Sequence, residues 1–222
     1  MIKKVLKTGI GILLLPLLAG TSAAFYGQFG NIEVIFTKEQ QYFLWGIITY
    51  CAVQLLLFKP AFIYVLGHEA VHALATWFCL GRVTSFKISP SGGSISTSKS
   101  NLFISLSPYF VPIYAILAII LYYVVNDVFF WGFLTRPYFM FLLGVMLAFH
   151  IVMTVDTLKI RQPDLVKAGY LTSLILIYVI NLIIVSGALG LLFKSFSFRS
   201  FINSSYFMSL DIYRNIFSQL FL

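Results

Sequence analysis

The residues best suited to chemistry lie within one helical turn. His68, Glu69 and His72 fall in the stretch YVLGHEAVHALATWF, although the whole chain has only three histidines and seven acidic residues. Residues four apart on a helix share one face, so the two imidazoles can converge on one metal ion. Glu69 points to a flanking face, where its carboxylate can take a proton from water without binding the metal. This HExxH spacing predicts two zinc ligands and a general base.

The setting of this motif argues against a chance match with structural histidines. The motif lies inside an apolar run, and an ionisable group in a bilayer costs about 2.5–3.5 kcal/mol on insertion scales. Three such groups in one turn need compensation, which a bound metal with a nearby carboxylate would provide.

The third zinc ligand is left open by the residues themselves. Catalytic zinc usually has three protein ligands and one open position. Asp156 and Asp164 lie within the segment TVDTLKIRQPDLVKAG, and each can also be read as an interfacial residue paired with Lys159 or Arg161. His150 precedes Asp156 and is a candidate ligand, a residue that hydrogen-bonds to a metal ligand, or a structural hydrogen-bond donor.

The composition indicates an integral membrane protein. Of 222 residues, 60% are hydrophobic and 10% are charged, whereas a soluble domain carries about 25% charged residues. The net charge is +8, but the basic residues are scattered through short loops, which favours membrane anchoring over nucleic-acid binding. Since a backbone in lipid must satisfy its own hydrogen bonds, we expect an all-α polytopic fold.

The apolar runs predict about six transmembrane helices in a single membrane-embedded domain, residues 1–222, with a core at about 58–193. The expected spans are residues 9–26, 42–58, 61–80, 103–125, 137–158 and 168–193. Pro60 is expected to start the third span. Residues 1–26 are a first span or a cleaved signal peptide, and residues 194–222 a tail that forms an interfacial helix or is partly disordered. Counting Lys and Arg on alternate loops does not decide the orientation.

A different pattern follows the motif helix. Residues 81–102 are rich in Ser and Gly, and polar and apolar residues alternate from Val83 to Ser89. This predicts a short β-hairpin or an extended loop, with Gly92-Gly93 as its turn.

The segments GHEAVHAL, GRVTSFKISPSGGSIS, SLSPYFVPIYAI and QPDL together resemble the site-2 protease type of intramembrane zinc metalloprotease, in particular a small bacterial branch. The resemblance covers about residues 58–181. It implies a membrane-associated hairpin after the motif helix and an Asp ligand on a later helix, which favours Asp164 over Asp156. The ligand motif Asn-Pro-x-x-x-Leu-Asp-Gly of better-known members is absent, and the length leaves no room for a PDZ or CBS domain.

We therefore expect a zinc endopeptidase that holds one Zn²⁺ per chain and cleaves membrane-protein or peptide substrates in or near the bilayer. The resemblance implies a bacterial inner membrane. The alternatives are a non-catalytic zinc-binding scaffold, a metal-handling transporter and a hydrolase of small membrane-soluble molecules. A transporter would spread its ionisable residues over several spans, whereas this chain gathers them around one helix and one later segment.

Overall fold

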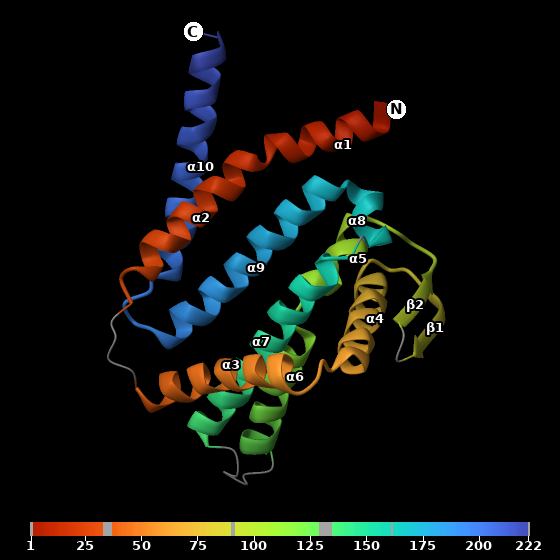
Figure 1. Ribbon diagram of the computed structural model, residues 1–222, viewed down its shortest axis with the longest axis vertical. Coiled ribbons are helices and arrows are strands. Elements are labelled where there is room, and N and C mark those ends of the chain that lie inside the picture. The colour runs from red at the N-terminus through yellow and green to blue at the C-terminus, as the bar shows by residue number, and fades with distance from the viewer. Residues whose placement is uncertain (1, 33–36, 90–91, 129–134, 161, 222) are drawn as a thin grey trace. The chain divides into compact units, whose positions relative to one another are not determined.

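The computed structural model describes residues 2–32, 37–89, 92–128, 135–160 and 162–221 (Figure 1). Most of these residues are helical, and the strands among them form one two-stranded sheet. The chain divides into two compact units, residues 36–162 and residues 1–35 together with 163–222. The two ends of the sequence thus build one unit, and the middle of the chain builds the other.

The unit of residues 36–162 begins with two helices joined at a sharp bend. α3 (Lys38–Leu56) starts with a capping box, in which Thr37 accepts from the backbone N–H of Gln40 and the Gln40 side chain accepts from that of Thr37. α4 (Ala61–Phe78) follows Pro60, as the sequence predicts, and is bent by 118° from α3. Proline lacks the N–H that would continue α3 and has the fixed φ that suits a helix start, so the break falls there.

α3 packs along α7 (Arg136–Leu158), the helix that ends near the candidate ligands. At this crossing, one glycine on each helix faces the backbone of the other helix. A Cβ on Gly46 would lie 2.1 Å from the carbonyl oxygen of Phe141, and one on Gly144 would lie 2.2 Å from that of Phe43. Small residues of this kind allow two membrane helices to approach backbone to backbone.

The core of this unit forms where α3, α4 and α7 meet. Its buried cluster contains three aromatic side chains, and the ring of Phe149 makes edge contacts with Tyr50 at 5.5 Å and Tyr64 at 6.2 Å between centroids. Ala148 and Met153 complete the cluster. The motif helix α4 is therefore fixed against α7 through its first turns.

The segment after α4 is a β-hairpin, one of the two conformations that the sequence predicts. β1 (Val83–Ser89) pairs antiparallel with β2 (Gly92–Thr97), and both strands pack against α4. The expectation of a turn at Gly92-Gly93 is wrong, because both glycines belong to β2 and pair with Ser89 and Ile88. The residues between the strands, 90 and 91, lie outside the described part.

The expected span 103–125 is broken into pieces. α5 (Leu102–Leu106) runs into the 3₁₀ turn η1 (Ser107–Tyr109), and α6 (Ile113–Tyr123) continues as a π-helical turn, η2 (Val124–Val128). The two halves are bent by 72°. Pro108 and Pro112 explain the break, since each removes a backbone donor inside the apolar run.

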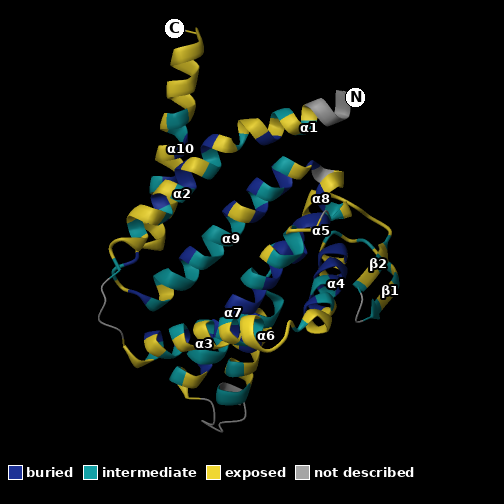
Figure 2. Cartoon of the chain, in the orientation of Figure 1, coloured by how far each residue is buried: buried dark blue, intermediate teal, exposed yellow. Residues whose placement is uncertain are grey.

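The regular secondary structure in the described residues of the unit 1–35 and 163–222 consists of helices. Its helices are α1 (Ile2–Leu13), α2 (Leu15–Phe29), α8 (Pro163–Ala168), α9 (Tyr170–Leu192) and α10 (Phe198–Phe221). α10 packs on α2, where a Cβ on Gly20 would lie 2.3 Å from the Oγ of Ser209. The tail that the sequence leaves open is thus a long helix, whose last two and a half turns are exposed in this unit (Figure 2).

Among the described residues, three helical stretches are long and apolar enough to cross a membrane: residues 6–29, 136–158 and 170–192. The bent pairs α3–α4 and α5–α6 raise this to five if each pair is one span. The chain is a membrane protein by this measure, but the expected six spans are not confirmed. The difference comes from runs that are apolar enough in sequence but are bent within the fold.

Candidate metal centre

The two motif histidines lie on one face of α4, as their spacing predicts. The ring centroids of His68 and His72 are 5.0 Å apart, and their planes are nearly perpendicular at 79°. The helix is continuous from Ala61 to Phe78, so nothing in its backbone separates the two side chains. Two imidazoles at this distance can offer nitrogen atoms to one ion.

The tautomer of His72 is fixed by the backbone of α5. His72 is buried, and its Nδ1 lies 2.8 Å from the carbonyl oxygen of Ile104. A carbonyl oxygen only accepts, so Nδ1 carries the proton and Nε2 keeps the lone pair that a metal requires. Asn101 caps α5 by accepting from the N–H of Ile104, which holds that carbonyl in place. A backbone carbonyl on the far nitrogen is the usual partner of a metal-binding histidine.

Aromatic rings hold His68 in position. The ring of Tyr109, which is fully buried in η1, lies at 4.9 Å between centroids and at 85° to the His68 ring. Tyr64, one turn earlier on α4, lies at 5.7 Å. His68 is therefore confined between two tyrosines, which limits the rotation of its side chain.

Glu69 is buried beside the hairpin and borders a pocket. Its side chain is covered by the backbone of β2, since a Cβ on Gly93 would lie 2.6 Å from the Cγ of Glu69. His68, Glu69 and Asp156 all line the same pocket of about 390 Å³ between α4, β2 and the end of α7. The residue predicted as general base thus faces a space that a substrate could enter.

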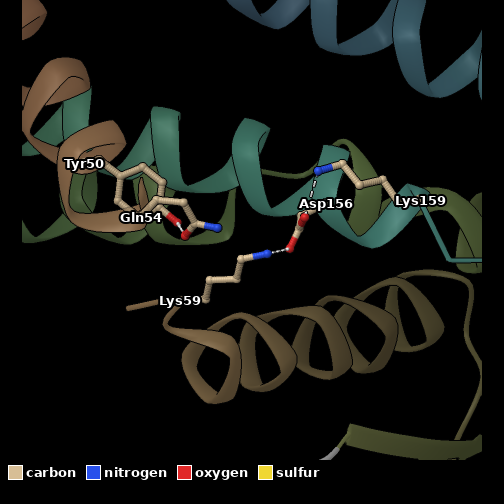
Figure 3. Close-up of polar contacts among 5 residues, drawn as sticks. All are labelled: Tyr50, Gln54, Lys59, Asp156 and Lys159. Atoms are coloured by element: carbon tan, nitrogen blue, oxygen red, sulfur yellow. Dashed lines mark hydrogen bonds and ion pairs between the residues drawn. The ribbon is translucent and has the colours of Figure 1, made fainter. Parts of the chain in front are cut away.

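Asp156 is held by two lysines (Figure 3). Its Oδ2 accepts from Lys59 Nζ at 2.8 Å, and its Oδ1 accepts from Lys159 Nζ at 3.0 Å. The Lys159 pair is the one weighed in the sequence analysis, whereas Lys59 joins Asp156 to the bend between α3 and α4. Both oxygens of Asp156 are engaged, so binding a metal would require breaking ion pairs.

His150 is buried on α7 and lies close to His68. The two histidines line a small cavity of about 10 Å³ together with Tyr64 and Gly67. A cavity of this size has room for the centre of about one water molecule. His150 therefore borders the same small cavity as His68, and its role at the metal site stays a prediction.

Asp164 lies in the first turn of α8, as expected for a residue preceded by a helix-starting proline. Its carboxylate is 3.9 Å from Lys167 Nζ, and its side chain is about 25% exposed in the structure. Asp164 belongs to the unit of residues 1–35 and 163–222, whereas His68 and His72 belong to the unit of residues 36–162. Two imidazoles and a carboxylate suit zinc, and they also suit other divalent transition metals.

Three residues of this region are not predicted by the sequence. Gly93, expected in a turn, packs on Glu69. Tyr109 packs on His68 and Lys59 binds Asp156, although neither residue lies near its partner in sequence. The segment SLSPY around Tyr109 offered the best signal, because a proline-bounded break in an apolar run often marks a functional part of a membrane protein.

Comparisons of the chain with models of protein families, with curated proteins and with solved structures find no match.

Proposed function

We propose that this protein is an intramembrane zinc endopeptidase. The observation that carries the proposal is the arrangement on α4, where His68 and His72 share one face and Glu69 borders the 390 Å³ pocket. The fixed tautomer of His72 supports it, because Nε2 is the nitrogen left to bind a metal. A carboxylate beside two such histidines fits a general base better than a purely structural site.

The proposed ligands are His68, His72 and Asp164. Asp164 belongs to the other unit, so this choice rests on the resemblance to site-2 proteases and on the suitability of two imidazoles and a carboxylate for zinc. Asp156 is the alternative third ligand, and its two lysine partners speak against it. Bound zinc would supply Lewis-acid chemistry at a peptide carbonyl.

In this mechanism Glu69 moves the proton. Its carboxylate accepts a proton from the attacking water as the new C–O bond forms at the peptide carbon. Glu69 then gives this proton to the amide nitrogen as the C–N bond breaks, so the products are a carboxylate and an amine. Burial of Glu69 beside β2 keeps the carboxylate oriented toward the pocket.

We propose a membrane-protein or peptide substrate that is extended at the cleaved bond. A helical substrate hides its peptide bonds, and the hairpin β1–β2 offers a free strand edge with which an unwound segment can pair. A bacterial inner membrane is the location that the resemblance suggests.

The proposal is tested by metal content and cleavage measured on the same samples. Wild type and the variants His68→Ala, Glu69→Gln, Asp156→Asn and Asp164→Asn are purified in detergent, and bound metal is measured by elemental mass spectrometry. Cleavage is followed by mass spectrometry of new N-termini after incubation with a library of membrane peptides. We expect about one zinc per wild-type chain, loss of zinc in His68→Ala and Asp164→Asn, and retention in Asp156→Asn.

Glu69→Gln is the decisive variant. It should keep its zinc and lose cleavage by at least about 100-fold, as expected for removal of a general base. Zinc binding with no cleavage by wild type would support a non-catalytic scaffold instead. Absence of any bound metal from wild type would overturn the proposal.

A further inference from the structure

The pocket beside Glu69 is large enough for part of a substrate. Its volume of about 390 Å³ falls in the range of about 300–1,000 Å³ seen for ligand pockets. All of its lining residues belong to the unit 36–162, and they include His68 and Glu69. A group bound there would touch the residues to which we assign the reaction.

Most of the pocket wall is apolar or bare backbone. α4 contributes Tyr64 and Val65, and α7 contributes Met153, which is 4% exposed and part of the core cluster. Gly92 and Gly93 form the β2 side, which has no side chains. Such walls favour an aliphatic side chain, which gains affinity by leaving water.

The charged groups at the pocket disfavour binding of a basic substrate side chain. Asp156 lines the pocket, but Lys59 and Lys159 already occupy both of its oxygens (Figure 3). Because both oxygens of Asp156 are already paired with lysines, this carboxylate is not available to pair with a cationic side chain in the pocket. The other acid of the pocket is Glu69, and a cation paired with it would block the proposed base.

We infer that this pocket is the side-chain subsite next to the cleaved bond, and that it selects a neutral aliphatic residue and rejects Lys or Arg. The inference rests on the proposed function and adds its substrate preference. The lysine-bound Asp156 is the specificity-determining group, because its pairing with Lys59 and Lys159 removes the carboxylate that would otherwise bind a basic side chain.

The test uses three small hydroxamates on the full-length protein loaded with zinc in detergent. The hydroxamate group binds the metal, and the side chain reports on the pocket. The probes are the Nα-acetyl hydroxamates of glycine, norleucine and lysine, and the last two share a four-carbon side chain to which lysine adds a terminal ammonium group. Kd is measured by calorimetry, and zinc content is measured on the same samples.

We expect the norleucine probe to bind at least about tenfold more tightly than the glycine probe, and the lysine probe to lose this gain. The double variant Lys59→Met, Lys159→Met frees the Asp156 carboxylate and should narrow the gap between lysine and norleucine probes at least about fivefold. Lys38→Met, a lysine at the start of α3, is the control and should leave the gap unchanged.

Equal binding of all three probes to a zinc-loaded protein would overturn the inference and leave the proposed function standing. An unchanged gap in the double lysine variant would overturn the role of Asp156 and its lysines. If the protein holds no zinc and binds no hydroxamate, the proposed function fails and the inference fails with it.

Discussion

Gly93 sets how closely the hairpin approaches Glu69. An added Cβ would lie 2.6 Å from Glu69 Cγ and 2.8 Å from Val65 Cγ1, and real atoms do not approach so closely. Glu69 would have to move, because it has the more flexible of the two side chains. The position of the proposed base therefore depends on a residue from a different element.

Gly93→Ala should impair cleavage and spare the metal. Displacing a reacting group by about 1 Å can cost on the order of 100-fold in rate, so we expect cleavage to fall about 10- to 100-fold. Zinc content should stay at the wild-type level, since the three atoms nearest to the added Cβ belong to Glu69 and Val65 and not to the histidines. Ser94→Ala, the next position on β2, is the matched control. Equal activity of Gly93→Ala and Ser94→Ala would contradict this role.

The residue scale is also where sequence reasoning succeeds best for the site. The spacing of His68 and His72 predicts a shared face, and the ring distance of 5.0 Å agrees. That prediction needs only the geometry of one helix. The contact between Gly93 and Glu69 could not be predicted, because it depends on how a hairpin folds back onto α4.

At the scale of elements, the hairpin β1–β2 is the part that we expect to receive the substrate. Phe86→Pro removes a backbone donor from β1 and should slow cleavage about tenfold or more, while zinc content is unchanged. Phe86→Ala removes the same side chain but keeps the N–H, and it should retain most of the activity. If the proline variant cleaves as fast as the alanine variant, strand pairing is not how substrate binds.

The crossing of α3 and α7 is a second element-scale feature that can be tested. A Cβ at Gly46 or Gly144 would collide with a backbone carbonyl, so the helices must separate to accept it. We expect Gly46→Ala and Gly144→Ala each to destabilise the protein by about 1–3 kcal/mol, as for other overpacked positions. Thermal unfolding in detergent would measure this.

Gly27→Ala is the control for that experiment, since nothing lies within 4 Å of its added Cβ. It should be neutral or slightly stabilising, because alanine favours a helix more than glycine does. A loss of stability at Gly27 equal to that at Gly46 would show that the effect is not specific to the crossing.

The sequence predicts correctly the elements that depend on local signals. It does not predict those whose course depends on tertiary packing. Pro60 marks the start of α4 correctly, since its geometry acts within one turn. The run 103–125 is apolar throughout, so hydropathy alone reads it as a single span even though α5 and α6 are bent by 72°. Hydropathy reports the composition and length of a segment, and it carries little information on whether the helix runs straight or bends.

At the scale of the whole molecule, the expected number of six membrane spans is the main prediction that still has to be tested. Six spans would make the first and last span run in opposite directions. The unit of residues 1–35 and 163–222 argues otherwise. At one end Thr172 Oγ1 of α9 donates to the carbonyl oxygen of Lys7 in α1 at 3.0 Å, and at the other end the N–H of Ser197 donates to Gln28 Oε1 at 3.4 Å. The first and last span therefore run in the same direction.

Two parallel spans require an odd total, either three or five on the lengths observed, and residues 31 and 194 should lie on the same side of the membrane. In a background of Cys51→Ser and Cys79→Ser, the single cysteines Asn31→Cys and Lys194→Cys are labelled with a membrane-impermeant maleimide in sealed vesicles of one orientation. Both positions are exposed in the structure, so accessibility within the fold does not limit labelling. We expect both to react in the same vesicles, or both to be protected until detergent is added. Labelling of one and protection of the other would restore an even number of spans and contradict the direction of α9 relative to α1 and α2.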